Sequence, residues 1–245
     1  GVLSFLLLLH NSLQRNILSP KAKTISRMAG TFFSVALYLA FIFHLAGYCL
    51  RWYIGGRIPL SNGYETMQFM ALCILLIACL LHRRFSFILP FGFLLSGFAL
   101  LVSYLGQMNP QITPLMPVLV SPWLSIHVSL IMMSYALLAF IMLNGILALC
   151  LRKKESENNV SGNDAIQDNR IEQLTLVSRL LLYPATFFLG AGIFLGAVWA
   201  NVSWGRYWAW DPKEVWALIT FLVYGVAFHS QSLRIFRKPL FFHIY

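Results

Sequence analysis

Six long apolar runs constrain this sequence more than any other feature. A helix that crosses a bilayer needs about 20 consecutive, mostly apolar residues. Runs of roughly that length extend over Gly30–Leu50, Glu65–Leu81, Phe85–Leu105, Trp123–Leu151, Leu180–Val202 and Val215–Ser232. Hydrophobic residues make up 59% of the 245 residues and charged residues only 11%, which is too little charge to cover a water-soluble surface. We expect an all-α, polytopic membrane helix bundle of about six transmembrane helices, and we exclude a soluble or nucleic-acid-binding protein.

The N-terminal stretch Leu3–Leu9 is also apolar, but it is too short to span a membrane, and no basic segment typical of a signal peptide precedes it. We expect residues 1–28 to form a truncated apolar stub with a cytoplasmic linker. Residues 29–245 are expected to form one transmembrane domain that lacks a final span. Between the fourth and fifth runs, the polar stretch Glu155–Glu172 predicts a solvated loop.

The basic residues orient the bundle. When the six runs alternate across the membrane, fourteen of the 18 lysines and arginines fall on one side and four on the other. The four are Arg51, Arg57, Arg206 and Lys213. Because lysine and arginine concentrate in the cytoplasmic loops of membrane proteins, this asymmetry places the segments that carry these four residues on the outer side.

The outer segment 204–216 is unusually rich in tryptophan. Four tryptophans fall within its thirteen residues, and Trp199 lies just before it. The four are Trp204, Trp208, Trp210 and Trp216. Tryptophan prefers the membrane–water interface, so an aromatic belt is one interpretation. The density favours another, an aromatic platform that binds a large planar ligand by stacking and burial of area.

The end of this segment has the pattern of a helix start. Asp211 suits the N-cap, Pro212 the first helical position and Glu214 the capping-box position three residues after the cap. We therefore predict that Asp211 caps the last helix. This role is compatible with ligand binding, because a cap would anchor the tryptophan-rich segment and preorganise it.

Histidines occur at two depths of the predicted bundle. His127 begins the fourth run on the outer side, and His44 lies near the outer end of the first. His229 follows Pro212 by 17 residues, which carries it about 25 Å inward along a helix. Because His127 and His229 lie on opposite sides of a bilayer about 30 Å thick, they cannot bind one metal ion together. Either one of them is a ligand, or there are two sites at two depths.

Three motifs together resemble one family. The segment Trp204–Glu214 resembles the tryptophan-rich WWD signature of haem-handling proteins. Arg51–Glu65 and Trp123–Val128 match the pattern of one branch, the CcsA family, which is the haem-binding half of System II cytochrome c synthases, sometimes fused to CcsB. The WWD signature is shared with the relatives CcmC and CcmF, so the other two motifs distinguish the branch.

The resemblance implies a path for haem. It enters from the cytoplasmic side, is held within the membrane and reaches an outer site under the WWD loop, where the two thiols of a Cys-x-x-Cys-His apocytochrome c add to its vinyl groups. The implied partners are haem b, apocytochrome c and a CcsB (ResB-like) half or subunit, in a bacterial inner membrane with the WWD loop on the periplasmic side. Whether the chain takes part in an enzyme, the haem lyase, stays open. The alternative functions are a haem transporter or CcmC-type delivery protein without synthase activity, and a structural subunit.

The same resemblance assigns residues to haem. His127 and His229 are the implied axial ligands, at the outer and intramembrane sites respectively, and each site takes its second ligand from outside this sequence. The implied cofactor-binding residues, with His44 as an accessory candidate, are His127, His229, Trp204, Trp208, Trp210, Asp211, Arg206 and His44. Separately, we expect one of the outer arginines, Arg51, Arg57 or Arg206, to pair with a haem propionate. The alternative is that these arginines only anchor the interface.

Overall fold

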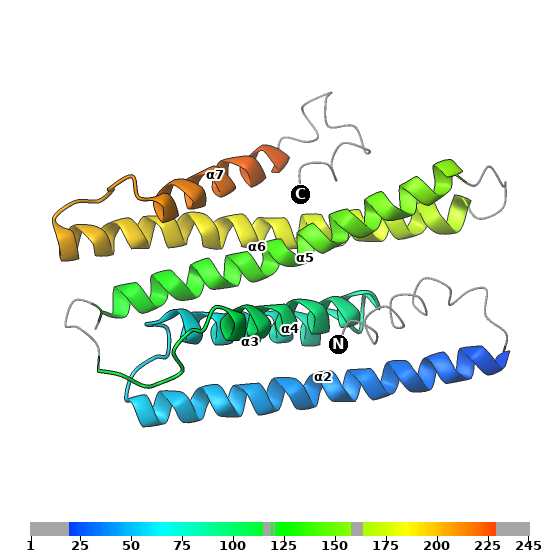
Figure 1. The fold of residues 1–245 in the computed structure, drawn as a ribbon. Helices are drawn as coiled ribbons and strands as arrows, with labels where there is room; N and C mark the ends of the chain where they lie inside the picture. The colour runs from blue at the N-terminus through cyan, green and yellow to red at the C-terminus, as the bar shows by residue number, and fades with distance from the viewer. Residues whose placement is uncertain (1–19, 115–118, 120, 158–163, 229–245) are drawn as a thin grey trace. The chain divides into compact units, whose positions relative to one another are not determined.

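The computed structural model describes residues 20–114, 119, 121–157 and 164–228. Within these residues it holds six α-helices and no β-strand (Figure 1). Five of the helices are long and apolar enough to cross a membrane, over Arg27–Gly55, Gly63–Leu81, Ile88–Leu105, Pro122–Leu151 and Arg170–Trp204. The predicted sixth span begins as α7 (Pro212–Val226), whose 15 described residues are shorter than a span.

The first compact unit contains α2 (Pro20–Gly55), α3 (Gly63–Leu81) and α4 (Ile88–Leu105). Helix α3 packs against both α2 and α4. Small residues bring α3 and α4 close together, because a Cβ added at Gly92 would lie 2.5 Å from the Cβ of Ala78. Close approach at small residues is the usual way for membrane helices to gain packing contacts where lipid offers no hydrophobic driving force.

The second unit contains α5 (Pro122–Glu157), α6 (Asp164–Trp204) and α7. In Figure 1, α5 and α6 run side by side in opposite directions, and α7 returns along α6. Side chains of α5 reach α6 at successive levels. His127 bonds to the Gly192 carbonyl, Ser134 donates to the Ala185 carbonyl at 2.8 Å, and Asn144 donates to the Ser178 hydroxyl at 3.3 Å. These contacts fix the register of the antiparallel pair.

The surfaces of the helices confirm a multi-pass membrane protein. Large apolar side chains point away from the protein all along α2: Phe32 is 69% exposed, Phe43 82% and Leu50 61%. Water would penalise such a continuous apolar surface, whereas lipid tails accept it. Leu37, on the opposite side of the same helix, is fully buried.

Most of the polar stretch Glu155–Glu172 is helix and not the loop that we predicted from its composition. Helix α5 continues to Glu157 and α6 begins at Asp164, and residues 158–163 lie outside the described residues. The reason is that Glu, Gln, Lys and Arg are good helix formers, so both helices continue past the apolar runs. The spans are also longer than the apolar runs indicate. The part of α6 that is apolar enough to cross a membrane begins at Arg170, whereas the apolar run begins at Leu180.

Candidate functional site

His127 is held by a hydrogen bond to the neighbouring helix. It lies in the second turn of α5, and its Nδ1 is 2.6 Å from the Gly192 carbonyl oxygen of α6. Because a carbonyl can only accept, Nδ1 carries the proton and donates it. The neutral ring then presents Nε2 with a free lone pair, the arrangement found in metal-binding histidines whose other nitrogen is fixed by a carbonyl.

A glycine makes room for this ring. A Cβ added at Gly196 would lie 2.6 Å from Cε1 and 2.7 Å from Nδ1 of His127, closer than side chains tolerate. Gly192 and Gly196 are one turn apart on α6 and share a face, so one supplies the carbonyl and the other the space. The sequence singled out His127 but not these two glycines, because an apolar helix gives no signal of which neighbour a glycine meets.

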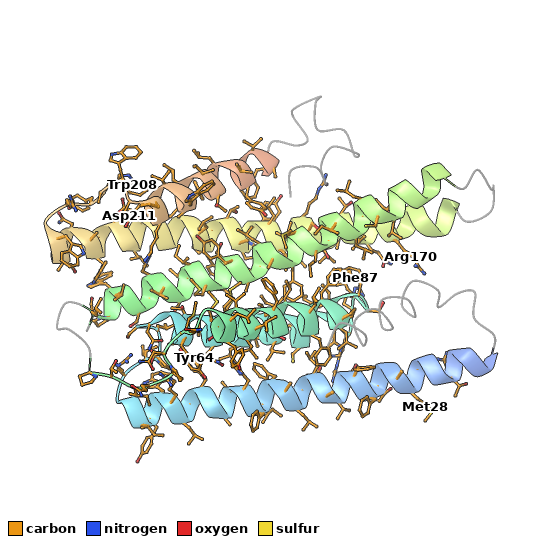
Figure 2. All side chains as sticks on the ribbon, in the orientation of Figure 1. Met28, Tyr64, Phe87, Arg170, Trp208 and Asp211 are labelled. Atoms are coloured by element: carbon orange, nitrogen blue, oxygen red, sulfur yellow. The ribbon has the colours of Figure 1, made fainter. Side chains whose placement is uncertain are left out.

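The predicted N-cap at Asp211 is confirmed. Its carboxylate accepts from the backbone amides of Lys213 at 2.7 Å and Glu214 at 3.0 Å, and Glu214 returns the bond to the amide of Asp211 at 3.3 Å. Figure 2 shows Asp211 and Trp208 where α6 gives way to α7. The capping box therefore ties the tryptophan-rich segment to the start of the last described helix.

Glu214 does more than complete the capping box. The same carboxylate oxygen also accepts from the amide of Ala209 at 2.8 Å, so it is hydrogen-bonded to the backbone on both sides of Trp210. Trp210 has φ of 59°, a left-handed conformation that is strained for a residue with a side chain. The two bonds to Glu214 oppose that strain and hold the Trp210 side chain outward, where it is 74% exposed.

The tryptophans form two edge-to-face pairs. Trp199 and Trp204 have ring centroids 6.4 Å apart, and Trp208 and Trp210 5.9 Å apart. This geometry is favourable for aromatic rings and leaves ring faces available. The indole nitrogens of Trp199 and Trp208 are buried without a hydrogen-bond partner. The region thus combines ring faces with unpartnered donors, a combination suited to a planar ligand that carries hydrogen-bond acceptors.

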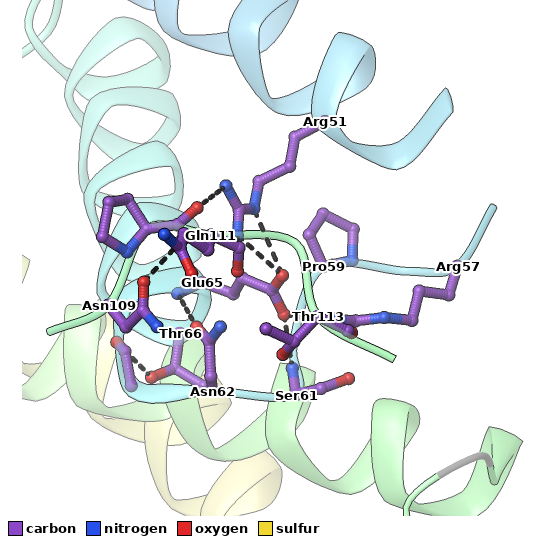
Figure 3. Close-up of polar contacts among 12 residues, drawn as sticks. Arg51, Arg57, Pro59, Ser61, Asn62, Glu65, Thr66, Asn109, Gln111 and Thr113 are labelled. Atoms are coloured by element: carbon purple, nitrogen blue, oxygen red, sulfur yellow. Dashed lines mark hydrogen bonds and ion pairs between the residues drawn. The ribbon is translucent and has the colours of Figure 1, made fainter. Parts of the chain in front are cut away.

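The first unit also contains a polar cluster that the sequence alone did not indicate (Figure 3). Glu65, only 1% exposed, forms ion pairs with Arg51 at 3.1 Å and Arg57 at 3.0 Å. Arg51 also donates to the Pro110 carbonyl at 2.7 Å, and Arg57 to the Thr113 carbonyl at 3.4 Å. The cluster thereby ties the segment after α4 to the segment between α2 and α3. Both arginines already have a carboxylate partner within the protein.

Arg206 differs from these two arginines. It is exposed in the tryptophan-rich segment, and no ion pair joins it to a carboxylate within residues 121–151 and 170–228, whose side chains the structure describes. Of the three arginines considered for a propionate, it is the one whose charge is not taken up by a glutamate. Its pairing with a propionate stays a prediction.

Three other histidines, His229, His44 and His82, have different outcomes. His229 lies outside the described residues, so its ligand role stays a prediction. His44 bonds through Nε2 to the Gln68 carbonyl at 2.8 Å, which gives it a packing role between α2 and α3, and its accessory role also stays a prediction. His82, just after α3, bonds to the Tyr38 hydroxyl at 3.0 Å, and burial together with the charge of Arg83 lowers its pKa.

Comparisons with known proteins show the family of this chain. The model of the family described as cytochrome C assembly protein matches residues 60–244. Protein NrfI of Wolinella succinogenes is 38% identical over 197 residues, which cover 80% of this chain and 21% of NrfI. Cytochrome c biogenesis protein CcsA is 38% identical in Chlamydomonas reinhardtii, over 76% of this chain and 53% of that protein. In Guillardia theta it is 36% identical, over 75% and 67%.

The chain therefore matches only part of the first two relatives, a fifth of NrfI and half of the Chlamydomonas protein. The family match, in contrast, covers α3 to α7 and includes both His127 and the whole tryptophan-rich segment. Together with the relatives, it shows that this chain belongs to the cytochrome c assembly protein family, as a CcsA-type cytochrome c biogenesis protein.

Proposed function

We propose that this chain holds haem b at the outer face of a bacterial inner membrane and presents it for attachment to an apocytochrome c. The observation that carries the proposal is the preset state of His127. Its Nδ1 is engaged by the Gly192 carbonyl, and its ring rests over Gly196, so Nε2 is available to an iron atom. A side chain held in this way loses little conformational freedom when it binds a metal.

The tryptophan-rich segment supplies the rest of the site in this proposal. Trp204, Trp208 and Trp210 offer ring faces and edges to the macrocycle, while Asp211 and Glu214 hold the backbone that presents them. Arg206 pairs with a propionate, since its guanidinium has no carboxylate partner in the described part of its unit. His229 holds haem at a second, intramembrane site, and the CcsB (ResB-like) half supplies its partner ligand.

The chemistry rests on positioning. Bound haem would supply two vinyl groups. Each apocytochrome thiol would add across one of them, so that the S–H bond and the vinyl π bond break and one C–S and one C–H bond form, without net oxidation. The protein's own contribution is to hold the ring so that the vinyl edge faces the incoming Cys-x-x-Cys-His segment. Such orientation can replace about 7–11 kcal/mol of an entropic barrier. On this view the chain is part of a haem lyase.

Reconstitution tests the proposal. The chain is co-expressed with a CcsB-type partner and an apocytochrome c in cells that lack their own attachment system, and covalent haem is detected by haem staining of denaturing gels. We expect His127→Ala to abolish the stained band and His82→Ala to leave it unchanged. Haem that co-purifies with the chain while no holocytochrome forms would instead support a CcmC-type delivery protein. A holocytochrome yield that is unaffected by His127→Ala would refute the proposal.

A further inference from the structure

The described part of the chain contains buried donors that no acceptor meets. Four buried side-chain polar atoms lack a partner: the Ser103 hydroxyl, the Asn144 amide oxygen and the indole nitrogens of Trp199 and Trp208. The two indole nitrogens can only donate hydrogen bonds. Trp208 lies in the tryptophan-rich segment 204–216, and Trp199 lies just before that segment. A buried donor without an acceptor destabilises a folded protein, and a native structure retains it where a ligand or ordered water completes the bond.

Trp199 is placed beside His127 by the periodicity of α6. Gly192 bonds to His127, Gly196 lies against its ring, and Trp199 follows three residues later. Positions 192, 196 and 199 recur on one face of a helix, so Trp199 lies on the stripe that contacts His127, about 4.5 Å further along the axis. A ligand held on His127 Nε2 is therefore adjacent to the turn of α6 that carries the unpartnered indole.

The charges nearby favour an anionic acceptor. The segment after Trp199 carries two cations, Arg206 and Lys213, and two carboxylates, Asp211 and Glu214. Both carboxylates are engaged by backbone amides within the capping box. No ion pair joins either cation to a carboxylate in the described residues of this unit. The segment has no net formal charge, but its carboxylates already accept from backbone amides, while Arg206 and Lys213 have no carboxylate partner there and are available to a carboxylate of a ligand.

We propose that Trp199 and Trp208 recognise a tetrapyrrole by donating hydrogen bonds from their indole nitrogens to its two carboxylates. This inference rests on the proposed function and adds the chemical group by which the ligand is selected. The tryptophans then act in two ways. Their rings stack, as any aromatic platform does, and two of their N–H groups discriminate between ligands that carry carboxylates and ligands that do not. Trp204, Trp210 and Trp216 have no buried, unpartnered N–H, and this role is not assigned to them.

The test compares haem with its dimethyl ester, in which both carboxylates are masked. Affinities of the purified chain in detergent are measured by absorbance titration for the wild type, Trp199→Phe and Trp208→Phe. Phenylalanine keeps an aromatic ring and removes the donor. Trp216→Phe is the matched control, because Trp216 is 66% exposed on α7 and outside the proposed site. Thermal unfolding of each variant confirms that it is folded.

We expect each of the two substitutions to weaken haem binding about tenfold, the size expected for a lost hydrogen bond to a charged group. Ester binding should change less than about twofold, and Trp216→Phe should change neither. If Trp199→Phe does not fold, Trp208→Phe alone tests the inference. Trp208 lies outside the helices, so its substitution changes no helical residue. Equal losses for haem and ester, or no loss for either, would overturn the inference while leaving haem binding intact. A wild-type chain that binds neither compound would overturn the proposed function as well.

Discussion

Gly196→Ala tests how His127 is positioned. The added Cβ would lie 2.6 Å from Cε1 of His127, and ordinary contact begins near 3.4 Å, so the ring must retreat by about 0.8 Å. It cannot retreat freely, because Nδ1 is held 2.6 Å from the Gly192 carbonyl on the same helix face. The hydrogen bond must lengthen or the two helices must separate, and overpacking of this kind costs about 1–3 kcal/mol.

The effect on haem should exceed the effect on stability. Disturbing a group that orients a metal-binding histidine lowers metal affinity by about 10–100-fold. On helix propensity alone, alanine would instead stabilise α6 by about 1 kcal/mol, so a loss isolates the steric effect. The assay is an absorbance titration of the purified chain with haem, alongside thermal unfolding followed by circular dichroism.

Gly225→Ala is the control, because a Cβ there meets nothing within 4 Å in the described structure. We expect it to bind haem like the wild type. Wild-type affinity and an unchanged haem spectrum in Gly196→Ala would show that Gly196 does not position His127, because haem binding would then be insensitive to a Cβ placed against the ring.

Three further predictions concern other contacts. Glu65→Ala leaves two half-buried arginines without their carboxylate and should lower the free energy of unfolding by about 3–5 kcal/mol. Chemical unfolding measures this loss against the control Glu172→Ala, at an exposed position, which should change the free energy of unfolding by less than about 0.5 kcal/mol. Equal losses in the two variants would contradict a stabilising role of the Glu65 ion pairs. Glu214→Ala should release Trp210 from its strained conformation and speed proteolysis of the tryptophan-rich segment. Glu214→Gln keeps an acceptor and should change the rate of proteolysis far less. Identical digestion patterns of the two variants and the wild type would show that Glu214 does not hold this segment. Gly92→Ala should lower the free energy of unfolding by about 1–3 kcal/mol, and adding Ala78→Gly to the same protein should recover part of this loss. If the two substitutions instead lower the free energy additively, residues 78 and 92 do not contact each other.

Much of the fold was predictable, because membrane-spanning helices can be recognised in a sequence from the length and hydrophobicity of their apolar runs. Asp211 as N-cap was also predictable, since capping is a local pattern of four residues. The polar stretch Glu155–Glu172 misled the prediction because its composition suits both a solvated loop and an exposed helix, and only helix propensity distinguishes them.

The interior of the site was not predictable from single residues. Glu65 lies in the sequence between two arginines and an apolar run, and nothing local indicates that both arginines converge on it. The contacts between α5 and α6 left one faint signal, since His127 and Ser134 are spaced by a heptad and both bond to α6. Gly196 left none, because its role depends on which residue of the partner helix lies opposite it.

If His127 holds haem, as we propose, removing this side chain must change the reduced-minus-oxidised visible spectrum of the purified protein. The comparison is between the wild type, His127→Ala and His82→Ala, the last being a histidine bonded to Tyr38 in the other unit. We expect a haem spectrum in the wild type and His82→Ala, and a lost or shifted spectrum in His127→Ala. A wild type without haem, or a His127→Ala protein with the wild-type spectrum and haem content, would contradict it.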